Sequence, residues 1–116
     1  MLSHALEQGV LVLSIHHDPG VDGRAALLTE ISDLVHAFNP APVVIILEDQ
    51  AATGAALSVV LRAHQVCSSL GIVMSVATHS ALARRLLEAN ADTSGIRLVI
   101  HARTDTAVTT AYAAAA

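Results

Sequence analysis

Short apolar runs alternate with longer amphipathic segments along this chain, and that alternation restricts the fold more than any other feature. Four runs rich in branched aliphatic residues are typical of strands; they lie at 10–16, 43–47, 72–77 and 96–101. Between them, apolar residues recur at intervals of three and four, as on one face of a helix, over 22–38, over 55–70 and through Leu82, Leu86 and Ala89. Strand–helix–strand units of this length imply parallel pairing with right-handed crossovers. The sequence therefore predicts a central, mostly parallel sheet.

Both ends of the chain extend this pattern. Gln8-Gly9 predicts a tight turn that folds residues 3–7 back on the following strand, which places a hairpin at one edge of the sheet. Thr104 and Asp105 are suitable caps for a last helix, which the alanine tail at 113–116 either extends or leaves frayed. We therefore expect one α/β domain over residues 1–116, with about four helices.

The composition limits the class of protein. Hydrophobic residues make up 53% of the 116 residues and aromatic residues only 2%, so a single aliphatic core is expected. No apolar run approaches the roughly 20 residues that span a bilayer, and the basic-then-apolar pattern of a secretory signal is missing. The net charge is −4 and all six basic residues are arginine, which argues against nucleic acid and excludes lysine chemistry. We expect a cytoplasmic protein that binds neither nucleic acid nor a membrane.

The sequence predicts neither a disulfide nor a metal site. Cys67 is the single cysteine, which fits a reducing compartment, and its side chain is expected to be buried on a helix. Among seven histidines, His16 and His17 follow a strand, and His79 or His101 could add ligands from neighbouring strand ends. Adjacent strand residues point to opposite faces, however, and no Cys/His pair has metal-ligand spacing. No metal or other cofactor is therefore predicted.

Motifs of common enzyme and signalling classes are missing as well. The turn from Asp18 to Gly23 lacks the glycine spacing of a dinucleotide site, and no G-x-S-x-G element of a serine hydrolase occurs. A receiver-like phospho-aspartate domain would need a lysine after its last strand. We therefore expect a non-enzymatic protein without catalytic residues.

Three stretches in the second half agree with a known family in order, spacing and residue type. They read Leu61-Arg62-Ala63-His64, then Leu70-Gly71-Ile72-Val73-Met74-Ser75-Val76, then Ala83-Arg84-Arg85-Leu86-Leu87-Glu88. This pattern resembles the STAS domain of bacterial anti-sigma-factor antagonists, and the resemblance covers nearly the whole chain. It implies a domain that binds an anti-sigma factor which is also a serine kinase, and that is released when its own serine is phosphorylated. In the family that serine lies in an Asp-Ser-Ser-Gly-like turn before the second helix.

The corresponding turn of this chain has lost the serine. If Gly54 is aligned with the family's glycine, Ala51 takes the acidic position, Ala52 the acceptor position and Thr53 the second hydroxyl position. Alignment without a gap from Gly71 backwards places the acceptor on Gly54 or Ala55 instead. The nearby hydroxyls are those of Thr53 and Ser58, and each is a candidate phosphorylation site. The alternative is a structural role, as a helix cap for Thr53 and as an exposed polar residue for Ser58.

These observations predict a regulatory protein–protein interaction module of the STAS type. We expect it to bind an anti-sigma-factor serine kinase through one surface, formed by Ala51, Ala52, Thr53, Gly54, Ser58, Arg62 and Gln65. The alternatives are a small-ligand-binding or sensory module on the same fold, and a STAS subunit of a larger assembly. A homodimer and a monomer are equally compatible with the sequence.

Overall fold

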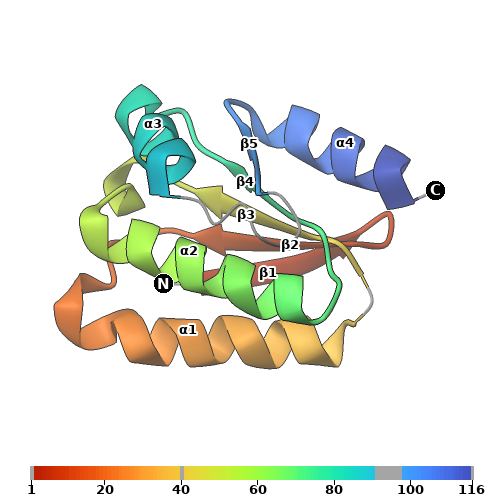
Figure 1. Ribbon diagram of the computed structural model, residues 1–116, viewed down its shortest axis with the longest axis horizontal. Coiled ribbons are helices and arrows are strands. Elements are labelled where there is room, and N and C mark those ends of the chain that lie inside the picture. Colours follow the sequence, from red (N-terminus) through yellow and green to blue (C-terminus); the bar gives the residue numbers. More distant parts are fainter. Residues whose placement is uncertain (1, 40, 91–97, 116) are drawn as a thin grey trace.

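A computed structural model describes residues 2–39, 41–90 and 98–115, and it confirms the predicted α/β domain (Figure 1). Within these residues a five-stranded sheet is flanked by helices on both faces. The elements are β1 (Leu2–Glu7), β2 (Val10–Ile15), α1 (Gly20–Ala37), β3 (Val43–Leu47), the 3₁₀ helix η1 (Asp49–Ala51), α2 (Gly54–Ser69), β4 (Met74–Ala77), α3 (Ala81–Asn90), β5 (Val99–His101) and α4 (Thr104–Ala115).

The strands follow their chain order across the sheet, β1-β2-β3-β4-β5. β1 pairs with β2 in antiparallel fashion, and the other neighbouring strands are parallel. Gln8 and Gly9 form the predicted two-residue turn, with φ angles of 53° and 79°. Two consecutive positive φ angles match the strand twist at a tight hairpin, which explains why a glycine stands at one of the two positions. The hairpin leaves β1 as an edge strand.

The larger core lies between the sheet and helices α1, α2 and α3. The odd-numbered residues of β2 and β3, such as Leu13 and Ile45, point to this side and are fully buried. Leu27, Ile31 and Val35 supply the buried stripe of α1, one turn apart as the periodicity predicted. α1 and α2 lie side by side along the sheet (Figure 1), and one flank of each helix therefore contacts the other helix.

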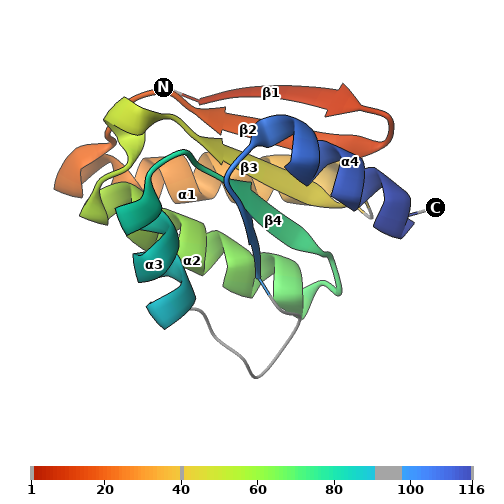
Figure 2. The same cartoon turned by 90° about the horizontal axis from the view of Figure 1, so that it is seen from above.

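The second face of the sheet is covered by α4. Val10, Val12 and Val44 pack there with Ala107 and Ala111 of the helix. The small alanine side chains let the helix backbone approach the strands closely. Figure 2 shows α4 crossing the sheet on the side away from α1. The continuous apolar run of β3 is thus explained, because both of its faces are covered.

Element ends differ from the prediction in places that local geometry explains. β4 begins at Met74 rather than residue 72, because Gly71 adopts φ 72° and the Ile72 amide donates back to the Cys67 carbonyl at 2.8 Å. The predicted strand at 96–101 falls partly on residues 91–97, which are outside the described residues. Helix α4 includes residues 113–115, and residue 116 is outside the described residues. None of the described helices has the length and apolar character needed to cross a bilayer.

Candidate functional site

The loop before α2 is organised by the hydroxyl of Thr53. Thr53 is the N-cap residue of the helix, and its Oγ1 accepts a hydrogen bond from the Ala56 amide at 3.4 Å. The same hydroxyl donates to Oδ1 of Asp18 at 2.9 Å. The interpretation of Thr53 as a helix cap is therefore confirmed. A phosphate on Thr53 would replace the donated proton and lie beside the Asp18 carboxylate, which opposes it electrostatically.

Ala51 does not lie on the predicted binding surface. It ends η1, its side chain is 0% exposed and it packs in the larger core. The 3₁₀ turn causes this, because it directs Ala51 inward between the end of β3 and the start of α2. Ala52 is half-buried and packs against the same core, whereas Gly54 is exposed. The part of this turn that a partner can reach is therefore Ala52 to Gly54.

The predicted residues of α2 do share one face. Ser58 is half-buried, and Arg62 and Gln65 are exposed, each about one turn after the one before. A groove runs along each side of this row, a feature that the sequence did not predict. Ser58 and Arg62 line both grooves.

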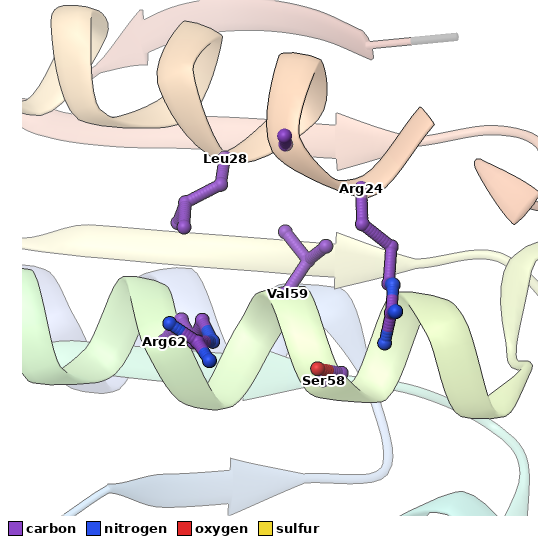
Figure 3. A pocket seen from close by; sticks show the side chains of 6 residues that line it. Arg24, Leu28, Ser58, Val59 and Arg62 are labelled. Carbon is purple, nitrogen blue, oxygen red and sulfur yellow. The ribbon is translucent and has the colours of Figure 1, made fainter. Parts of the chain in front are cut away.

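The first groove lies between α1 and α2 and has a volume of about 250 Å³. Arg24 reaches across from α1, and Ser58 lies between it and Arg62 in the view of Figure 3. Leu28 and Val59 point toward each other and form the apolar part of the wall. Two guanidinium groups and a hydroxyl thus surround an apolar floor, a combination that suits a ligand group with a negative charge and an adjoining apolar portion.

Neither arginine of this groove is neutralised within the described part of the chain. The guanidinium–carboxylate pair there is Arg103 with Asp105, and the Glu48 carboxylate is hydrogen-bonded to His16. Arg84, by contrast, donates from Nη1 to the Thr78 carbonyl at 2.8 Å and so holds the loop before α3. Arg24 and Arg62 therefore keep their donors for a partner.

The second groove lies between α2 and α3 and has a volume of about 460 Å³. Leu57 and Leu61 of α2 face Leu86 and Asn90 of α3 across it, and Gln65 lines it as well. Leu86 is exposed in spite of its apolar side chain. This groove therefore combines leucine side chains with the polar side chains of Ser58, Arg62, Gln65 and Asn90.

Among the residues of this site that sequence reasoning missed are Arg24, Leu28 and Leu86. Arg24 and Leu28 are four residues apart on α1, as Ser58 and Arg62 are on α2. Two helices that follow consecutive parallel strands on one sheet face become neighbours. This topology could therefore have predicted that one flank of α1 lies beside α2. Leu86 had been assigned to the apolar stripe of α3, and only the packing shows that it faces the groove.

The histidines do not assemble a metal site in the described residues, where no group of three or more His, Cys, Asp or Glu side chains has suitable geometry. Nδ1 of His16 is instead hydrogen-bonded to Oε2 of Glu48.

No protein-family model matches the chain, and no curated protein matches it. The likeness to the STAS domain thus rests on the order, spacing and residue types given above.

Proposed function

We propose that this chain is a non-enzymatic interaction module that docks a protein partner on the α2 row, Ser58, Arg62 and Gln65, and in its two flanking grooves. One observation carries the proposal: Arg24 and Arg62 line an apolar groove and have no ion-pair partner among the described residues. In a chain of net charge −4, this groove gathers two of the six basic residues. The partner it suits presents an acidic side chain next to apolar residues.

The class of partner follows from the resemblance. A STAS-like module would bind an anti-sigma-factor serine kinase in the cytoplasm, and the buried, unpaired Cys67 is compatible with that reducing compartment. Because Ala52 or a neighbouring residue without a hydroxyl stands in place of the serine, we propose that binding is constitutive or is controlled by other means.

The experiment is a native pull-down from the source cells, followed by calorimetric titration of the recovered partner. Arg62→Glu reverses a charge at the shared wall of both grooves, and Arg85→Glu makes the same change on the exposed part of α3 outside them. We expect the wild type and Arg85→Glu to bind a serine-kinase-type ATPase and Arg62→Glu to lose at least about tenfold in affinity. Absence of such an ATPase, or equal binding by both variants, would overturn the proposal.

A small anionic ligand is a second candidate occupant of the groove between α1 and α2. Its volume of about 250 Å³ and its paired guanidinium groups favour this alternative. Native mass spectrometry of the purified chain tests it: a retained mass that Arg24→Gln and Arg62→Gln both abolish would support a small-ligand module. An unliganded mass in every preparation would count against it.

A further inference from the structure

Three side chains meet at the carboxyl edge of the sheet on the α4 side: Ser3 of β1, and His16 and Glu48, which directly follow β2 and β3. Ser3 is opposite Ser14 in the β1–β2 register, and Ile46 is beside Ser14 in the β2–β3 register. Pleating places His16 two residues beyond Ser14 on the same face, and Glu48 two residues beyond Ile46. The backbone ladder continues this far, because the Glu48 amide donates to the Ile15 carbonyl at 3.2 Å. The α4 side is opposite the α1–α2 docking surface.

The three side chains are hydrogen-bonded in sequence. Ser3 Oγ lies 2.7 Å from Nε2 of His16, and Nδ1 of His16 is bonded to Oε2 of Glu48. An ionised carboxylate only accepts hydrogen bonds, so Nδ1 of His16 carries the proton. In the neutral imidazole, Nε2 then holds a free lone pair that accepts the Ser3 hydroxyl proton. His16 and Glu48 are 36% and 38% exposed, which leaves the cluster open to small reagents.

This order of groups is the one that activates a serine. A hydroxyl becomes a nucleophile when a neighbouring base takes its proton as the new bond forms, and a carboxylate on the far nitrogen orients the base and stabilises its cation. Ser14 lies directly across the strand pair from Ser3, but among the described residues it is the Ser3 hydroxyl that is bonded to His16. The two serines therefore differ in chemistry although they are neighbours.

We propose that Ser3 is an activated nucleophile that accepts acyl groups from activated esters. Oγ attacks the ester carbonyl carbon while its proton passes to Nε2 of His16. The bond from that carbon to the leaving alcohol oxygen then breaks, and the imidazolium returns the proton to the leaving oxygen. The products are an ester of Ser3 and the free alcohol, so no oxidant or further reactant is required. Neither groove of the docking surface includes Ser3, His16 or Glu48, so the two functions are separable.

The probe is p-nitrophenyl acetate, added to the full chain. Release of p-nitrophenolate gives the rate, intact mass gives the number of acetyl groups, and peptide mass spectrometry gives the acetylated residue. We expect one acetyl group on Ser3. Its rate should fall about 100-fold in His16→Gln, the usual size of a general-base contribution, and by a smaller factor in Glu48→Gln.

Matched controls separate activation from mere exposure. Ser14→Ala removes the cross-strand hydroxyl, and His17→Gln removes an imidazole adjacent to His16; both should keep the wild-type acetylation rate. Urea unfolding of every variant shows whether the sheet is intact. If Ser3 is acetylated no faster than other serines of the chain, or if a folded His16→Gln variant reacts at the wild-type rate, the proposal is wrong.

Discussion

Thr53 Oγ1 donates a 2.9 Å hydrogen bond to Oδ1 of Asp18, and this bond joins the start of α2 to the loop that leads into α1. The same carboxylate oxygen accepts the Gly20 amide at 2.9 Å. One side chain thus holds the N-terminal ends of both helices that form the Arg24–Arg62 groove. This bond therefore joins the starts of the two helices whose side chains line that groove.

Replacement of Thr53 by valine keeps the shape of the side chain and removes the hydroxyl. The helix then loses its cap, and Asp18 loses one donor, so we expect the free energy of unfolding to fall by about 1–2 kcal/mol. Urea unfolding followed by circular dichroism measures the change. Thr53→Ser is the matched control, because it keeps the hydroxyl and should lose less than half as much.

An equal loss in Thr53→Ser and Thr53→Val would show that the methyl group, not the hydroxyl, supplies the stability. A Thr53→Val variant as stable as the wild type would show that the bond to Asp18 and the cap contribute nothing measurable.

Most helices and strands could be predicted from the sequence because each has a local signal. The periodicity of α1 and the branched aliphatic run of β3 directly reflect which of their faces are buried. The residue types alone predicted the Gln8-Gly9 turn and the capping hydroxyl of Thr53. These features need no knowledge of distant parts of the chain.

The candidate site was only partly predictable, because it depends on which elements become neighbours. The row on α2 follows from helical spacing, whereas Arg24 joins it only when α1 and α2 pack on the same sheet face. Ala51 was assigned to the surface by alignment with a motif, but the 3₁₀ turn buries it. The Gln8-Gly9 turn does set the β1–β2 register, but the contact of His16 with Glu48 also requires β3 to pair with β2, which no local pattern specifies.

The close packing of α4 on the sheet predicts intolerance of larger side chains at Ala107. This alanine is 0% exposed and lies against the small cluster of Val10, Val12 and Val44. Ala107→Leu should lower the free energy of unfolding by about 1–3 kcal/mol, because the helix must move outward to admit the added atoms. Urea unfolding is again the measurement.

Thr110→Leu is the control for Ala107→Leu, since residue 110 is on the exposed side of the same helix. Its effect should stay within about 0.5 kcal/mol. Equal stability of the two leucine variants would contradict the packing of α4 described here.

Cys67 makes the stability of the fold sensitive to alkaline pH. Its side chain is 0% exposed, and burial raises the pKa of the thiol from 9.0 to about 11. The folded state thus favours the neutral thiol, so its contribution to stability is complete below pH 9 and is lost as the pH rises from 9 through 11. A rise of the thiol pKa from 9.0 to about 11 corresponds to a fall of about 2–3 kcal/mol in the free energy of unfolding. The chain has no lysine and a single tyrosine, so few other groups titrate in this interval.

The measurement is a series of urea unfolding curves between pH 8 and pH 11.5 under a reducing, oxygen-free atmosphere, which prevents oxidation of the thiol. Cys67→Ala removes the titrating group, and its stability should be nearly independent of pH over this range, although lower at pH 8 because of the lost sulfur contacts. Tyr112→Phe removes the tyrosine hydroxyl at an exposed position and should reproduce the wild-type fall. If the free energy of unfolding falls equally with pH in the wild type and in Cys67→Ala, another group causes the fall. The Cys67 thiol would then ionise without destabilising the folded state.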